Sequence, residues 1–194
     1  MQVVQTDHGI QKIPMSTHRH QAEVHPGEDH REEHGEPDPH IWLSPELVKV
    51  QARTIRNALQ EIDPAHRLVY DVNYKAFVAT LAALDAEFRN MFVDKQGLQF
   101  MVFHPSWGYF ARTYGLKQIA VEIEGKDPKP AQLKAMIEHA KNSGIKIISV
   151  QPQFSSKSAK LVAKEIGGRV VVADHWLKTG RVIFANLSEK SKGL

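Results

Sequence analysis

The strongest constraint on the fold is the alternation of short β-type runs with helical segments after Gly97. Each run is followed by a segment with proline or serine near its start and glycine near its end, which is typical of a helix. A strand followed by a helix, repeated along the chain, implies a parallel sheet with right-handed crossovers. We therefore predict an α/β fold with a four-stranded parallel sheet flanked by helices, its strands at residues 98–103, 118–123, 145–150 and 169–173.

The helices between and after these strands are predicted from the same punctuation by proline, serine and glycine. In chain order they run from Pro105 to Gly115, from Pro130 to Gly144, from Ser155 or Ser156 to Gly167-Gly168, and over about residues 177–188.

Two further helices are expected before the sheet. Ser44 can cap the first of them, and Pro45 suits its first turn. The second begins with the similar pair Asp63-Pro64, and its apolar residues recur at helical spacing over residues 64–94. This spacing predicts one long amphipathic helix with the apolar stripe Val69, Phe77, Leu81, Leu84, Phe88 and Met91.

Residues 16–39 differ in composition from the rest of the chain. They include almost no apolar side chain, so they cannot bury enough surface to offset the entropy lost on ordering. Most of the 11 histidines of the chain lie in this segment or beside it, dispersed among acidic residues. That mixture suits weak, exchangeable binding of divalent cations. We interpret the segment as a mobile, His-rich acidic loop.

Composition and motifs exclude several classes of function. The 194 residues are 42% hydrophobic, which is enough for a core, and no apolar stretch is long enough to cross a bilayer. The net charge is +3, but acids and bases are interleaved, so we expect no nucleic-acid partner. The absence of cysteine rules out thiolate metal ligands. The P-loop, G-x-G-x-x-G, H-E-x-x-H and G-x-S-x-G motifs are also absent, so no motif-defined enzyme class is supported.

Candidate metal ligands lie at the ends of the predicted strands. In an open parallel sheet, ligands bind at the carboxyl edge of the strands. His104 follows the first strand and Asp174 follows the last, so both should project from that edge. His40, where the predicted loop meets the first helix, is the best third candidate. Imidazole and carboxylate donors without sulfur suit Zn²⁺ in tetrahedral geometry.

The residues by themselves leave other interpretations open. A lone histidine at a strand end is most often a hydrogen-bonding residue, and an aspartate before a helix is most often its N-cap. Glu122 or Glu124 could supply the carboxylate instead, or could be solvated. His175 is either an alternative donor or an exposed neighbour.

Two runs of residues resemble a known family. They are Asp38-Pro-His-Ile-Trp-Leu-Ser-Pro45 and Phe103-His-Pro-Ser-Trp-Gly-Tyr-Phe110, with the His-rich acidic segment before the first. Together they resemble the zinc and manganese substrate-binding proteins of bacterial ABC importers, called cluster A-I, over about residues 8–190. The His-rich loop is typical of the zinc-specific branch.

The resemblance implies a two-lobed protein with a long lobe-spanning helix and a metal ion between the lobes. Residues 1–15 would be a remnant of the amino-terminal lobe, 16–39 the loop, 40–95 a helical segment with the long helix, and 96–194 the carboxyl-terminal α/β lobe.

Within that family pattern, His40, His104 and Asp174 match metal ligands, whereas a further histidine ligand belongs to the amino-terminal lobe. This chain departs from many relatives at His175-Trp176, and from some at Gln151, where they carry Glu.

The predicted function is a monomeric zinc receptor without catalytic turnover. It would hold Zn²⁺ as cargo and deliver it to the membrane permease of an ABC importer, in the periplasm or another extracytoplasmic space. The first residues lack the basic and apolar regions of an export signal, so we expect that any such signal was removed or lies outside this sequence. The alternatives are a manganese-binding homologue, a zinc-dependent hydrolase in which Glu122 is the base, and a cytosolic metal buffer that uses the loop alone.

Overall fold

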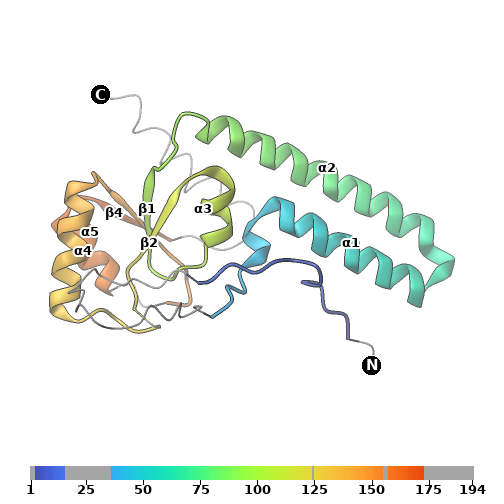
Figure 1. Ribbon diagram of the computed structural model, residues 1–194, viewed down its shortest axis with the longest axis horizontal. Coiled ribbons are helices and arrows are strands. Elements are labelled where there is room, and N and C mark those ends of the chain that lie inside the picture. The colour runs from blue at the N-terminus through green and yellow to red at the C-terminus, as the bar shows by residue number, and fades with distance from the viewer. Residues whose placement is uncertain (1–2, 16–35, 124, 155–156, 173–194) are drawn as a thin grey trace, which may run out of the picture.

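Four short parallel strands form a single sheet in this computed structural model, which describes residues 3–15, 36–123, 125–154 and 157–172. The strand order β2-β1-β3-β4 confirms the predicted four-stranded parallel sheet (Figure 1). In chain order the strands are β1 (Gln99–Val102), β2 (Lys117–Ala120), β3 (Ile147–Val150) and β4 (Arg169–Val172).

Helices cover both faces of this sheet. The helices α4 (Pro130–Asn142) and α5 (Lys157–Glu165) lie on one face, and α3 (Gly108–Tyr114) lies on the other (Figure 1). Successive side chains of a strand point to opposite faces. Phe100 and Val102 of β1 therefore join the core beneath α3, whereas Met101 joins the core beneath α4 and α5.

A helical hairpin extends away from the sheet. It is formed by α1 (Pro45–Ile62) and α2 (Arg67–Phe92), which pack side by side and are joined through the 3₁₀ turn η2 (Pro64–His66) (Figure 1). A second 3₁₀ turn, η1 (Ile41–Leu43), precedes α1. The carboxyl-terminal half of α2 reaches the sheet and is buried there through Leu81, Leu84, Phe88 and Phe92.

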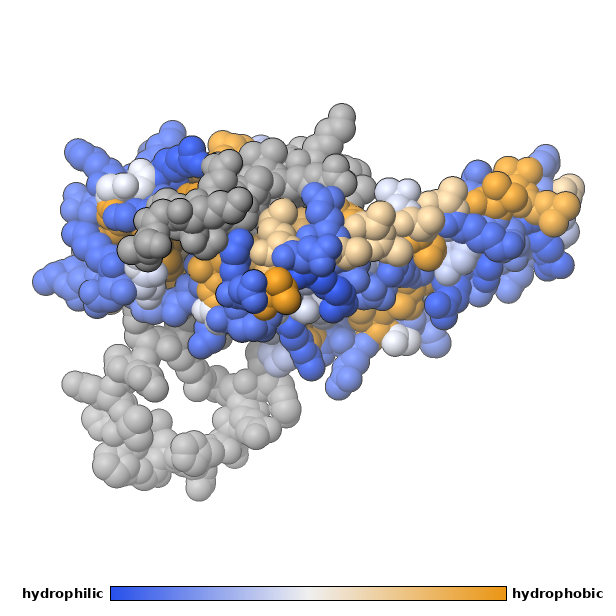
Figure 2. Space-filling view, turned by 90° about the horizontal axis from the view of Figure 1, so that it is seen from above, coloured by the Kyte–Doolittle hydropathy of each residue, from blue (hydrophilic) through white to orange (hydrophobic). Residues whose placement is uncertain are grey.

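The outer half of the hairpin carries exposed apolar residues. Figure 2 shows hydrophobic surface along this arm. The apolar stripe that was predicted for the long helix is therefore only partly buried, because the outer part of α2 has mainly α1 to pack against. Its exposed members include Val69 and Phe77, and other exposed apolar residues of the arm are Ile55, Leu59, Ile62, Leu68 and Val72.

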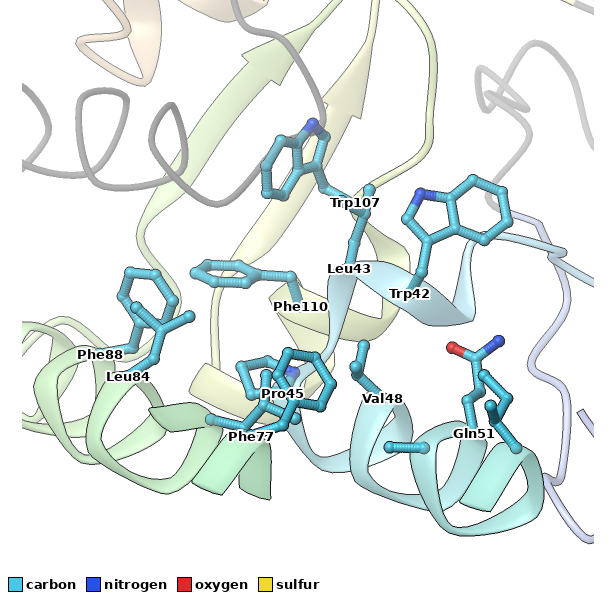
Figure 3. A pocket seen from close by; sticks show the side chains of 13 residues that line it. Trp42, Leu43, Pro45, Val48, Gln51, Phe77, Leu84, Phe88, Trp107 and Phe110 are labelled. Atoms are coloured by element: carbon cyan, nitrogen blue, oxygen red, sulfur yellow. The ribbon is translucent and has the colours of Figure 1, made fainter. Parts of the chain in front are cut away.

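An apolar groove of about 350 Å³ lies where the hairpin meets α3. In Figure 3, Trp107 and Trp42 lie on one side of the groove, and Pro45, Val48 and Phe77 lie on the side of the hairpin. Gln51 is the one polar side chain among the residues that line it. The groove therefore lacks the donors that a metal ion needs.

The predicted starts of three helices differ in detail from the structure. The long helix, predicted from residue 64, begins with the 3₁₀ turn η2 and is α-helical from Arg67 to Phe92. Ser44 lies at the N-cap position of α1, but its buried side chain makes no capping hydrogen bond. α3 begins at Gly108 rather than at Pro105, because residues 106 and 107 form a turn. The last predicted helix, at 177–188, lies outside the described residues.

The amino-terminal segment lies against the chain just before His40. Ile13 and Met15 bond to Asp38 and Glu36 through their backbones, with Asp38 N donating to Ile13 O at 2.8 Å. Glu36 and Asp38 belong to the end of the segment that was predicted as a loop, residues 16–39. Residues 16–35 of that segment lie outside the described part of the chain.

No helix in the described part of the chain is both long and apolar enough to cross a membrane.

The two ends of α2 should differ in their contribution to stability. Phe92 is 1% exposed and Phe77 is 40% exposed on the same helix. Phe92→Ala should lower the free energy of unfolding by about 3–5 kcal/mol, since it leaves a core cavity. The matched control Phe77→Ala should cost less than half as much in urea denaturation. Equal losses would contradict this account of the hairpin.

Asp85 lies where α2 meets α3, and it should make the stability of the chain depend on pH. Its carboxylate accepts bonds from Arg89 Nε at 2.8 Å and Tyr114 Oη at 2.9 Å. Burial, the largest single cause, raises the pKa of Asp85, but these two bonds together with the positive charges of Arg89 and Lys49 outweigh it, and the pKa is lowered overall. The resulting stability is present above the unfolded pKa of about 3.9 and is lost as pH falls through the lower folded value.

The variant Asp85→Asn should therefore be less stable than the original chain at pH 7, by about 1–3 kcal/mol. The difference should narrow as the pH approaches 3, because Asp85 of the unfolded chain is then mostly protonated and folding must release that proton. Urea denaturation of the two chains at pH 7, 5 and 3 measures the stability difference and its change with pH. A difference that stays constant would show that the charge of Asp85 is irrelevant.

Candidate metal centre

His104 lies at the topological switch point of the sheet. The chain runs from β1 to β2 on one side and later crosses to β3 on the other side of β1. Crevices of this kind, at the carboxyl ends of the strands, are where open α/β sheets bind ligands. The segment after β1 is held in place on both sides: Trp107 N donates to Gln118 Oε1 at 2.6 Å, and Gln151 Nε2 donates to Ser106 Oγ at 2.8 Å.

His40 reaches the same place from outside the sheet. It immediately precedes η1, and its backbone N–H donates to Asp38 Oδ1 at 2.9 Å. This local bond is of the kind that aspartate makes to the backbone N–H two residues on. Pro39 lies between them, which further restricts the backbone. The imidazole is thus presented from a stiff, mostly buried turn.

The two imidazoles face each other through one nitrogen each. His40 Nε2 and His104 Nε2 lie 3.3 Å apart, and the ring planes are inclined at 72°. The opposite nitrogen of each ring contacts a carboxylate: His40 Nδ1 lies 2.7 Å from Asp38 Oδ1, and His104 Nδ1 lies 2.7 Å from Glu122 Oε1. Each ring is therefore held from behind by an acid.

These carboxylates determine which nitrogen of each ring is available as a donor to a metal. An ionised carboxylate can only accept a hydrogen bond, so each Nδ1 carries the hydrogen. In a neutral imidazole the other nitrogen, Nε2, then has a free lone pair. Two lone pairs that face each other at 3.3 Å repel unless a proton or a cation lies between them. The pair is therefore arranged to receive a positive charge.

The burial of the two acids favours a divalent cation. Asp38 is 1% exposed and Glu122 is 5% exposed. Within the described residues, Asp38 Oδ2 and Glu122 Oε2 are buried and have no hydrogen-bond partner. Burying an ionised carboxylate costs free energy unless a positive charge compensates for it. Two such acids behind two neutral donors are balanced by one ion of charge +2.

The distance between the nitrogens suits zinc. Zinc binds imidazole nitrogen at about 2.0–2.1 Å in tetrahedral sites. Two such nitrogens around one tetrahedral ion lie about 3.3 Å apart, by simple geometry. The separation of His40 Nε2 and His104 Nε2, 3.3 Å, matches that value.

Aromatic side chains limit the movement of both rings. Phe154 stacks on His104, with ring centroids 4.8 Å apart and planes inclined at 23°. Trp42 meets His40 edge-on at 5.3 Å. Trp42 is itself 47% exposed, whereas His40 is buried.

Comparison with known proteins decides the family. The model of the family described as "Zinc-uptake complex component A periplasmic" matches residues 1–181. The chain belongs to this zinc-uptake family. Its α/β fold is also that of a solved structure from the family, described as a crystal structure of ZnuA, at a TM-score of 0.84 and 36% identity, covering 97% of this chain and 69% of the other.

Several members of the family are similar in sequence. The high-affinity zinc uptake system protein ZnuA of Bacillus subtilis (strain 168) is 34% identical over 70% of this chain and 43% of its own length. The zinc-binding protein AdcA of Streptococcus pyogenes serotype M3 is 30% identical over 79% of this chain and 30% of its own. The chain therefore spans less than half of these curated relatives.

A second solved member of the family was crystallised with its ion. It is described as a ZnuA deletion mutant, 138-173, with zinc bound, and it matches at a TM-score of 0.79 and 37% identity over 98% of this chain and 67% of its own.

The structure brings together two of the three predicted ligands. His40 and His104 meet, whereas Asp174 and the alternatives Glu124 and His175 lie outside the described residues. Glu122 is buried against His104 rather than solvated. Within the described part of the chain, no three histidine or acidic side chains form a complete metal cage.

Sequence reasoning missed the roles of Asp38 and Phe154. Asp38 was assigned to the end of the loop, although its position two residues before His40 is a local signal for the side-chain bond that forms. Phe154 had no such signal, because its contact with His104 depends on how the loop after β3 folds over the sheet edge.

Proposed function

We propose that this chain is the zinc-binding receptor of an ABC importer, and that His40 and His104 bind the ion through Nε2. The observation that carries the proposal is the facing pair of nitrogens at 3.3 Å, each ring held by a buried carboxylate. Zinc would be cargo, bound in an extracytoplasmic space and then passed to a membrane permease.

The named relatives support zinc as the cargo. The printed names of the Bacillus and Streptococcus proteins refer to zinc uptake and zinc binding. The donor chemistry agrees: imidazole suits zinc, whereas a site rich in carboxylate suits manganese. In this site the described acids lie behind the rings, so the nitrogens face the ion.

Two donors leave two positions of a tetrahedral zinc ion to other groups. We propose Asp174 as the third ligand, since it follows the predicted end of the strand at this sheet edge and matches the family's carboxylate. The histidines of residues 16–35 would add weak, exchangeable binding near the site. The division of the chain at residues 15, 39 and 95 likewise remains a prediction.

A hydrolase is the weaker interpretation of the same donors. A zinc hydrolase needs a base that can take a proton from the metal-bound water. Glu122 was the candidate for that role, but its Oε1 is occupied by His104 Nδ1 and its side chain is buried. The geometry therefore favours binding and release over turnover.

Calorimetric zinc titration tests the proposal. It is best made in a background that lacks residues 17–35, so that the loop histidines do not contribute. The double variant His40→Ala/His104→Ala should weaken zinc binding by more than about 100-fold, because loss of supporting residues alone costs 10- to 100-fold.

The matched control for this experiment is His66→Ala/His139→Ala. Both of those histidines are exposed, and neither contacts the site in the structure. The control should bind zinc like the parent chain. If the two double variants bound zinc equally, the site proposed here would be wrong.

The stacked ring of Phe154 should also contribute to zinc affinity. Phe154→Leu keeps an apolar side chain but removes the stacking on His104. Aromatic pairs contribute about 0.5–1.5 kcal/mol, so zinc affinity should fall about 2- to 10-fold. Phe154→Tyr keeps the ring and should retain the affinity. Equal affinities for Phe154→Leu and Phe154→Tyr would show that the stacking does not position His104.

A further inference from the structure

We infer that Gly108 and Tyr109 are positioning residues for His40. They hold Asp38 in the one place from which its carboxylate can direct His40 Nε2 toward His104. The inference deepens the proposed function and rests on it where zinc affinity is the readout. It assigns a role to two residues of the helix that follows His104, which would act on His40 through Asp38.

The orientation of His40 depends on one oxygen of Asp38. Asp38 Oδ1 accepts both the backbone N–H of His40, at 2.9 Å, and His40 Nδ1, at 2.7 Å. Asp38 Oδ2 accepts no hydrogen bond from the described residues, although it is buried. Within the described part of the chain, the carboxylate is therefore hydrogen-bonded through Oδ1 alone. What fixes the position of Oδ2 is the space that the surrounding atoms leave for it.

Gly108 provides that space. A Cβ atom built on Gly108 would lie 2.8 Å from Asp38 Oδ2 and 3.4 Å from Ile13 Cδ1. The first distance is shorter than van der Waals contact, so any side chain here would displace the carboxylate. Gly108 does not have a positive φ, and it is the first residue of α3. The glycine is thus required for space and not for its backbone conformation.

Tyr109 holds the backbone of the same aspartate. Its hydroxyl donates to Asp38 O at 2.8 Å and accepts from Ile13 N at 3.2 Å, and Asp38 N donates to Ile13 O at 2.8 Å. The carbonyl and the N–H of Asp38 are therefore both engaged. Tyr109 is buried, so these bonds are shielded from water.

The two ligand-bearing segments are linked through these contacts. Gly108 and Tyr109 follow His104 closely in the chain, while Asp38 closely precedes His40. The helix that follows one ligand thus sets the position of the acid that orients the other. This gives a physical reason for Gly-Tyr after one histidine and Asp-Pro before the other in the same chain.

A purely structural role for Gly108 and the inferred positioning role predict different effects of one substitution on zinc affinity. Alanine favours a helix over glycine by about 0.5–1 kcal/mol, so Gly108→Ala would keep or raise stability if only the helix mattered. Under the present inference, the same change moves the Asp38 carboxylate. Zinc affinity should then fall by about 10- to 100-fold, the range for loss of an outer-shell partner, without a loss of stability in urea denaturation.

A second readout does not depend on zinc. Long-range ¹H–¹⁵N NMR of the metal-free chain reports which ring nitrogen of His40 carries the hydrogen. The original chain should show hydrogen at Nδ1, and both Gly108→Ala and Tyr109→Phe should lose this preference. Tyr114→Phe is the matched control, because Tyr114 is also buried on α3 but donates to Asp85, away from His40. It should leave the NMR signature and the zinc affinity unchanged.

A double-mutant cycle tests whether Gly108 acts through Asp38. In an Asp38→Ala background there is no carboxylate to displace, so adding Gly108→Ala should cause little further loss of affinity. If the two substitutions instead lowered zinc affinity independently, so that their fold-losses multiplied, the inference would be overturned. It would also be overturned if the NMR signature of the His40 ring hydrogen were unchanged in both Gly108→Ala and Tyr109→Phe. If the original chain lacked a tight zinc site, the proposed function would fail, and the metal-free NMR comparison would still decide the positioning role.

Discussion

The candidate site depends on the hydrogen bond between each imidazole and a buried carboxylate. A neutral imidazole has one donor nitrogen and one acceptor nitrogen, and the acid behind it determines which is which. Asp38 and Glu122 each engage Nδ1, so that the Nε2 atoms of His40 and His104 face each other. Without a cation, this arrangement leaves two acids buried and two lone pairs opposed. The chain thus keeps an electrostatically unfavourable arrangement that a divalent ion relieves.

The α/β scaffold holds this arrangement in place. His104 lies where the order of the strands reverses, and the adjoining turn is held by Gln118 and Gln151. α3 then packs against the carboxyl-terminal half of α2, where Phe88 and Phe110 meet edge to face. The hairpin also contributes the apolar groove beside Trp42 and Trp107, which is separate from the polar donors of the site.

The fold was more predictable than the site. The parallel sheet followed from the alternation of strands and helices, because each short apolar run is bounded by its own helix signals. The buried stripe of the long helix was only partly predicted: Phe88 is buried and Val69 is exposed, although the spacing is the same for both. Periodicity indicates which side of a helix is apolar, but not how far along the helix a partner extends.

The sequence by itself determined the chemistry that is available: imidazole and carboxylate donors without thiols, at strand ends that share one edge of a sheet. These properties depend on residue type and on local pattern. Only the tertiary structure decided that His40 meets His104 across 64 residues, that Glu122 lies behind the ring of His104, and that Gly108 leaves room for Asp38. Such contacts depend on how distant segments pack to within a fraction of an ångström, and no local pattern of residues encodes that distance.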